Sequence, residues 1–135
     1  MKSFTPYLNF DGRTRDAMTF YHECLGGKLD VQTFGDSQMP GPPGSENRVI
    51  HARLEVDSGF IMASDSQAGQ SVTFGNNAYV CVDCSSVEEI ERFFAGISAG
   101  GTVTMPLQDT FWGARFGMCT DKFGVHWMFN CDKKG

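Results

Sequence analysis

The chain has 135 residues, of which 41% are hydrophobic and 20% are charged, a composition typical of an ordinary globular protein. Its formal net charge of −5 and its scattered Lys and Arg residues provide no electrostatic basis for nucleic-acid binding. No apolar run approaches the roughly 20 residues that cross a bilayer, and the first residues show no signal-peptide pattern. We therefore expect a cytoplasmic protein with neither a nucleic-acid nor a membrane partner.

The chain contains five cysteines, an odd number that favours free thiols over a disulfide framework. Cys81 and Cys84 have the Cys-x-x-Cys spacing that some zinc and redox sites use. No second pair of this kind accompanies them, so spacing alone supports such a site. Free structural cysteines are the favoured interpretation.

The first half of the chain predicts the order strand, helix and three strands. Alternating residues 5–10 predict a strand, and residues 13–25 predict a helix because apolar side chains recur at helical spacing. Gly26 and Gly27 should end that helix. Further strands are expected at residues 28–34, around residues 51–54 and at residues 60–64, with a turn between the last two. Residues 35–47, rich in Pro and Gly, are expected to form a mobile loop or lid.

The second half repeats this order. Residues 77–82 predict a strand, and a helix should begin at Ser85, with Glu88 completing a capping box. Gly100 and Gly101 should end that helix, and strands should follow from residue 102, around residues 113–116 and at residues 125–130. The triplets Ala52-Arg53-Leu54 and Ala114-Arg115-Phe116 occupy matching places in the two halves.

The repeat predicts an α+β fold of two tandem βαβββ modules, residues 1–66 and 75–135, joined by a linker at residues 67–74 in a single domain. If the mixed sheet curls around a central cup, side chains facing away from the helices line it. On the third strand that parity sends His51, Arg53 and Glu55 inward. The other residues expected to face the cup are Thr5, Tyr7, Asn9, Gln32, Phe34, Met62, Ser64, Asn77, Tyr79, Cys81, Arg115, Cys119, His126, Met128 and Asn130.

Several segments in this order resemble the vicinal oxygen chelate (glyoxalase/bleomycin resistance) superfamily, and its PhnB-like branch in particular. They include residues 6–10 (Pro-Tyr-Leu-Asn-Phe), 51–54 (His-Ala-Arg-Leu), 100–107 (Gly-Gly-Thr-Val-Thr-Met-Pro-Leu) and 121–127 (Asp-Lys-Phe-Gly-Val-His-Trp). The resemblance covers nearly the whole chain. It implies a cup built by two modules, within one chain or across a dimer, and a homodimer is expected. PhnB-like sequences are also often labelled methyltransferase-like, but this chain lacks a Gly-x-Gly loop between a strand and a helix.

Metal-dependent members of that superfamily hold a divalent ion in the cup. Matching their ligand positions to this sequence gives Thr5, Met62, Asn77 and Met128. Neither a hard nor a borderline divalent cation favours two thioethers with a hydroxyl and an amide. We therefore expect no metal and no other cofactor at this site. A displaced divalent metal site using His51 and His126 is kept as the alternative.

The favoured function is the binding of a small organic ligand in the cup, and Arg53 and Arg115 would suit an anion. Either arginine could equally form an internal salt bridge, for example to Glu55, Asp65 or Asp109. Trp112 could stack on the ligand or pack between chains. The alternatives are an enzyme of the lyase, isomerase or dioxygenase type and a protein that sequesters its ligand unchanged. The residues expected to contact the ligand are Tyr7, Phe34, His51, Arg53, Met62, Asn77, Tyr79, Trp112, Arg115 and Met128; the candidate acid–base residues are His51, His126, Tyr7 and Glu55.

Overall fold

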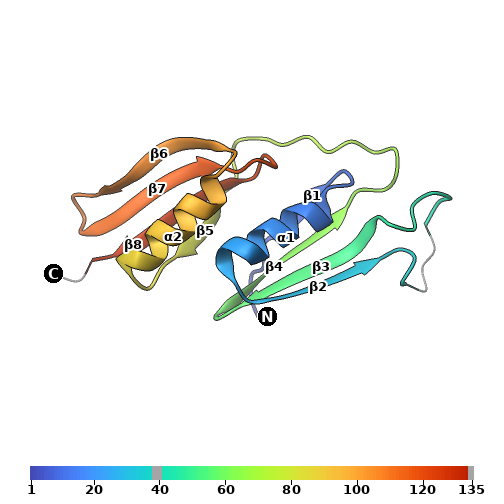
Figure 1. The fold of residues 1–135 in the computed structure, drawn as a ribbon, viewed down its shortest axis with the longest axis horizontal. Coiled ribbons are helices and arrows are strands. Elements are labelled where there is room, and N and C mark those ends of the chain that lie inside the picture. The colour runs from blue at the N-terminus through green and yellow to red at the C-terminus, as the bar shows by residue number, and fades with distance from the viewer. Residues whose placement is uncertain (38–40, 134–135) are drawn as a thin grey trace. The chain divides into compact units, whose positions relative to one another are not determined.

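The computed structural model describes residues 1–37 and 41–133, and the chain divides into two compact units, residues 1–73 (unit 1) and 74–135 (unit 2) (Figure 1). In chain order, unit 1 contains β1 (Tyr7–Phe10), α1 (Thr14–Leu25), β2 (Lys28–Thr33), β3 (Val49–Val56) and β4 (Gly59–Asp65). Unit 2 contains β5 (Val80–Asp83), α2 (Val87–Ser98), β6 (Thr102–Asp109), β7 (Ala114–Thr120) and β8 (His126–Asp132).

The two units have the same sheet topology. Unit 1 has the strand order β1-β4-β3-β2 and unit 2 the order β5-β8-β7-β6. The pairs β1–β4 and β5–β8 are parallel, and the other neighbours are antiparallel. This confirms the α+β class and the tandem βαβββ modules. The mixed sheets are separate, four strands each, and neither closes into a barrel.

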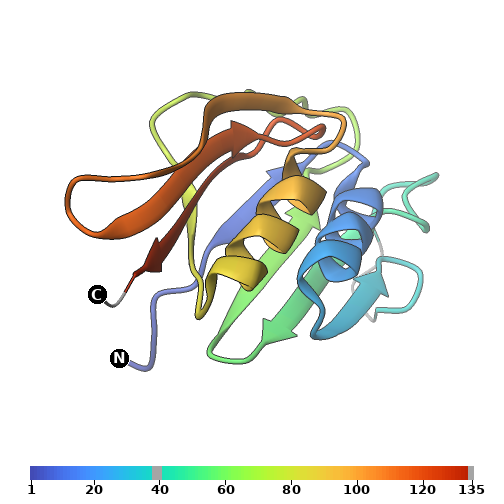
Figure 2. The ribbon, with the colours of Figure 1, turned by 60° about the vertical axis from the view of Figure 1, so that its left-hand side comes forward.

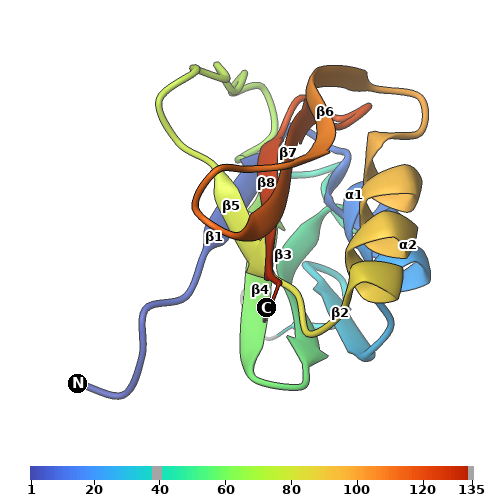
Figure 3. The same ribbon diagram turned by 90° about the vertical axis from the view of Figure 1, so that its left-hand side faces the viewer.

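One face of each sheet is covered by the helix of the same unit. Helix α1 contacts β2, β3 and β4 (Figure 2), and α2 contacts β6, β7 and β8 (Figure 3). Ala52, Leu54 and Ala63 are completely buried on the covered face of unit 1, and Trp127 and Phe129 are completely buried in unit 2. Because strand side chains alternate, the remaining positions point to the opposite side, which we call the open face of each unit.

The two helices have 12 residues each, and no helix in the described part of the chain is long and apolar enough to cross a membrane. Helix α1 ends at Gly26, whose positive φ of 77° few other residues adopt. The capping prediction for the second helix is wrong by one residue. Ser86 is the N-cap and accepts a hydrogen bond from the backbone N–H of Glu89, while the Glu89 carboxylate accepts one from Ser85 N.

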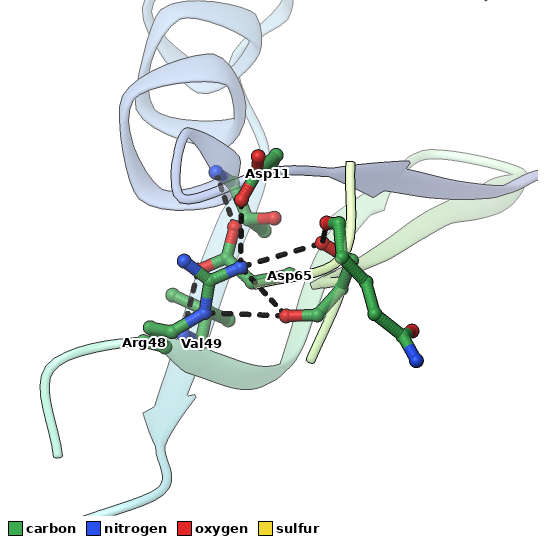
Figure 4. Close-up of polar contacts among 7 residues, drawn as sticks. Asp11, Arg48, Val49 and Asp65 are labelled. Carbon is green, nitrogen blue, oxygen red and sulfur yellow. Dashed lines mark hydrogen bonds and ion pairs between the residues drawn. The ribbon is translucent and has the colours of Figure 1, made fainter. Parts of the chain in front are cut away.

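A buried carboxylate joins three elements of unit 1 (Figure 4). Asp65, at the end of β4, accepts a hydrogen bond from the backbone N–H of Thr14 at 3.1 Å and another from that of Val49 at 2.8 Å. The first donor opens α1 and the second opens β3. Helix α1 has no side-chain cap of its own at Arg13, so Asp65 supplies the acceptor that its first turn needs.

Arg48 links further segments of unit 1 close to Asp65. Its guanidinium donates to the backbone oxygen of Ser66 and forms an ion pair with Asp11 at 3.0 Å (Figure 4). The strand β4, the loop after β1 and the start of β3 are thereby joined by charged and backbone groups at one place.

We predict that Asp65→Asn lowers the free energy of unfolding by about 1–3 kcal/mol, because an amide cannot accept both N–H bonds with equal geometry and loses the charge. Urea unfolding followed by circular dichroism measures this change. Asp57→Asn, an exposed site in the β3–β4 turn, is the matched control and should be close to neutral. Equal stability of the two variants would contradict the role assigned to Asp65.

Candidate functional site

The open face of unit 1 carries the densest group of the predicted site residues. Cross-strand pairing aligns Tyr7 with Met62, Met62 with Arg53, and Arg53 with Asp30 across the four strands. The neighbouring positions on this face are Asn9, Lys28, Gln32, His51, Glu55, Phe60 and Ser64. The sequence-based parity is therefore correct for β1, β3 and β4.

Arg53 is a cation that pairs with no acidic side chain among the described residues. Its guanidinium carbon lies 4.1 Å from the centre of the Phe60 ring, a cation–π contact that covers one of its faces. Asp30 lies directly opposite on β2 and Glu55 two residues along β3, yet neither forms an ion pair with Arg53. Within the described part of the chain Arg53 makes no hydrogen bond, and its Nε is buried and unsatisfied.

His51 lies two residues before Arg53 and contacts Tyr7. The Tyr7 hydroxyl and Nδ1 of His51 are 3.5 Å apart, a long hydrogen bond, and the ring centres are 6.0 Å apart. Tyr7 is 48% exposed. No described residue hydrogen-bonds Nε2 of His51, so that atom is available to a ligand. Of the four candidate acid–base residues, the structure brings Tyr7 and His51 together.

The direction predicted for Arg115 is wrong. Arg115 pairs across the sheet with Cys131, which is buried on the helix-covered face. Its guanidinium forms ion pairs with Glu91 of α2 at 3.4 Å and with Asp109 of β6 at 3.2 Å. Hydrogen bonds from Lys133 and then from Arg115 hold the pKa of Asp109 below its usual range. The sequence left two possible roles for Arg115, ligand binding and an internal salt bridge, and the structure shows the salt bridge.

The cause of this error is a register shift between the two modules. Arg53 pairs with Met62, and Met118 pairs with Met128, so Met118 and not Arg115 matches Arg53. The triplet match was displaced by three positions, and an odd displacement moves side chains to the other face. Cys119, also predicted to face the cup, is for the same reason completely buried beside Trp127.

The open face of unit 2 has a different chemistry. It carries Phe116, Met118, Met128 and the exposed Cys81, with Met118 and Cys81 flanking Met128 on the adjacent strands. Tyr79, 40% exposed, precedes β5, and its ring centre lies 5.4 Å from that of His126.

His126 has both ring nitrogens in use. Nε2 donates to the backbone oxygen of Gly75 at 2.8 Å, and Nδ1 is 2.8 Å from the hydroxyl of Thr120. The side chain therefore ties the segment before β5 to the start of β8. A metal or a substrate could reach either nitrogen only by breaking one of these bonds, so His126 is a weaker candidate than His51.

The remaining predicted contact residues lie outside the strands. Thr5 and Asn77 precede β1 and β5, Phe34 follows β2, and Trp112 lies in the turn between β6 and β7. Trp112 is 57% exposed and packs edge-to-face on Phe111 and Phe116. The loop or lid predicted at residues 35–47 includes residues 38–40, which lie outside the described residues.

None of the five cysteines forms a disulfide. Burial raises the pKa of the Cys84 thiol to about 12, with a smaller contribution from the Glu89 carboxylate, and burial also raises that of Cys119 to about 12. Burial and then the Asp83 charge raise the pKa of Cys81. Zinc binding and redox exchange need thiolates, whereas these environments favour the protonated form.

Phe60 is the site residue that sequence reasoning missed. It opposes Glu55 at the start of β4 and supports the Arg53 guanidinium. The sequence could have predicted the face on which Phe60 lies, because strand alternation on β4 puts it on the same face as Met62 and Ser64. The sequence could not have predicted that Phe60 contacts Arg53, because this contact depends on the register between β3 and β4.

Comparison with known proteins is consistent with this architecture. The family model described as 3-demethylubiquinone-9 3-methyltransferase matches residues 2–129. The chain belongs to this PhnB-like family. Protein YjdN of Escherichia coli K12 is 33% identical over 96% of this chain and 95% of its own length.

Solved structures of similar proteins agree with the family assignment. Protein PA1353 from Pseudomonas aeruginosa is 41% identical with a TM-score of 0.89, covering 99% of this chain and 100% of its own. The PhnB protein from Bacillus cereus is 28% identical with a TM-score of 0.78, covering 96% and 99%. A glyoxalase/bleomycin resistance protein from Albidiferax ferrireducens, 18% identical, shares the fold with a TM-score of 0.61 over 97% and 99%. The chain therefore shares its fold with a glyoxalase/bleomycin resistance protein.

The resemblance to the vicinal oxygen chelate superfamily implies a divalent metal, and the matched positions of this PhnB-like chain do not fit one. Thr5, Met62, Asn77 and Met128 supply a hydroxyl, an amide and two thioethers, with no carboxylate or imidazole. Across residues 1–37 and 41–133, no three His, Cys, Asp or Glu side chains group closely enough to hold a metal ion. We therefore derive no chemical step through a metal.

Proposed function

We propose that this PhnB-like protein binds a small organic anion on the open face of unit 1, with Arg53 as the anchor. The observation that carries the proposal is the contrast between two arginines. Arg115 has two carboxylates within 3.4 Å, whereas Arg53 has none within ion-pairing distance among the described residues.

The surroundings of Arg53 suit a carboxylate or phosphate group. Phe60 lies against the guanidinium, and no described residue hydrogen-bonds the guanidinium, a group whose planar fork suits the bidentate geometry of these anions. Met62 beside it and Tyr7 beyond it offer apolar and aromatic surface to the rest of the ligand. A partly buried cation that is not paired inside the protein is stabilised when an anion supplies the missing hydrogen bonds.

We further propose that the ligand is held without a divalent metal. The support is the donor set at the matched positions, whose thioethers are poor ligands for hard cations, and the engagement of both nitrogens of His126. A displaced site shared by His51 and His126 would need His126 to give up a hydrogen bond of 2.8 Å.

The working form of the protein is proposed to be a cytoplasmic homodimer. Phe111 and Trp112, in the β6–β7 turn, are 97% and 57% exposed, more apolar surface than a solvated turn normally presents. Cysteines that form no disulfide suit a reducing compartment.

Arg53→Met should weaken the binding of benzoate or butyrate at least about tenfold, the effect of losing a charge-assisted bidentate contact. Arg115→Met is the matched control, because its guanidinium pairs with Glu91 and Asp109 and lies away from the open face of unit 1, and it should bind within about twofold of the parent. Chemical-shift titration of the ¹⁵N-labelled chain measures both. Unchanged binding in the Arg53 variant would refute the proposed anchor.

Elemental analysis of protein purified without chelators should find far less than one zinc, nickel or iron ion per chain. The physical reason is the lack of anionic or imidazole donors at the matched positions. One tightly retained ion per chain would contradict metal-free binding, and its loss in the double variant His51→Gln, His126→Gln would identify a displaced site instead.

Light scattering of protein recovered from the cytoplasmic fraction should give twice the mass of the chain at micromolar concentration. The double substitution Phe111→Ser, Trp112→Ser should shift the mass toward that of one chain, since it removes the exposed apolar surface. A parent protein that is monomeric under these conditions would overturn the dimer.

A further inference from the structure

We infer that the anion bound at Arg53 is a small dicarboxylate, whose second carboxylate accepts a hydrogen bond from Nε2 of His51. This rests on the proposed anion site and adds the class of ligand. The second carboxylate would bind Nε2 of His51, an atom that no described residue hydrogen-bonds.

Two donors on β3 set the spacing. His51 and Arg53 are two residues apart on the same face, which places their Cα atoms about 6.8 Å apart. The Arg53 guanidinium extends along β3 toward Phe60, which opposes Glu55, and so away from His51. A single carboxylate is too small to contact both donors. A ligand with two anionic groups separated by a short carbon chain can bridge them.

Tyr7 orients the second donor. When the Tyr7 hydroxyl donates to Nδ1 of His51, the proton of the neutral ring lies on Nε2, which then points a donor away from Tyr7. In this tautomer Nε2 is a donor that a carboxylate of the ligand can accept from.

The charged groups on the face around His51 balance one another. The groups facing His51 are Tyr7 from β1, Met62 and Ser64 from β4, Asp30 and Gln32 from β2, and Arg53 and Glu55 from its own strand. Lys28 and Arg53 carry two positive charges, and Asp30 and Glu55 two negative ones, so the strands of this face have no net charge. This face therefore does not repel a dianion by net charge, and Nε2 of His51 supplies a second donor for it.

The matched ligand pair glutarate and butyrate tests this inference on the full chain, because butyrate is glutarate without its second carboxylate. At pH 6 the parent protein should bind glutarate about tenfold more tightly than butyrate, as expected for one additional charge-assisted hydrogen bond. His51→Gln should remove the preference at pH 6, and His22→Gln on α1 should keep it.

The outcomes separate the dicarboxylate from the anion site itself. The dicarboxylate inference is overturned if glutarate and butyrate bind alike, or if His51→Gln keeps the preference for glutarate. The anion site itself remains in either case, provided that Arg53→Met weakens the binding of both ligands. If Arg53→Met changes neither ligand, the proposed function is overturned. Tyr7→Phe provides a second variant should His51→Gln unfold: it leaves His51 without its orienting hydroxyl and should reduce the glutarate preference, and an unreduced preference would count against the inference.

Discussion

The buried carboxylate of Asp65 is the constraint on which unit 1 depends. It accepts the first backbone N–H of α1 and the first of β3 from its place at the end of β4. These two bonds determine where the helix begins over the sheet, and so which strand positions it covers. Ala52, Leu54 and Ala63 are buried beneath it, and strand alternation then sends Arg53 and Met62 to the open face. The candidate site is a consequence of that arrangement.

Unit 2 reaches the same topology without this carboxylate. Met128 matches Met62, so the position three residues later is Cys131 instead of Asp65. Helix α2 compensates with its own N-cap, Ser86, and Glu89 satisfies the backbone N–H of Ser85. A different buried carboxylate, Asp121, accepts hydrogen bonds from Val125 N and from the indole nitrogen of Trp127. The repeat therefore keeps its hydrophobic pattern while its polar contacts differ, and the two open faces differ with them.

The two arginines show how one residue type serves opposite purposes in one fold. On β7 the covered face is crowded, because a side chain at Gly117 would collide with Phe94 of α2 and with Leu107. Arg115 therefore extends beside the helix, where Glu91 and Asp109 neutralise it. On β3 the open face places Arg53 against Phe60 without an acidic partner. The two histidines differ in the same way. Both ring nitrogens of His126 are hydrogen-bonded, to Gly75 and Thr120, whereas no described residue hydrogen-bonds Nε2 of His51.

The sequence by itself determined the element order, the duplicated module and the faces of β1, β3 and β4, because local periodicity and Gly–Gly helix ends specify these. It also predicted Arg53, His51, Tyr7 and Met62 as neighbours on one face. Only the tertiary structure decided the face of Arg115 and Cys119, the pairing of Tyr7 with His51 and the support of Arg53 by Phe60. Cross-strand register depends on contacts between residues distant in the chain, and a displacement of three positions leaves the local pattern plausible while it reverses every side chain.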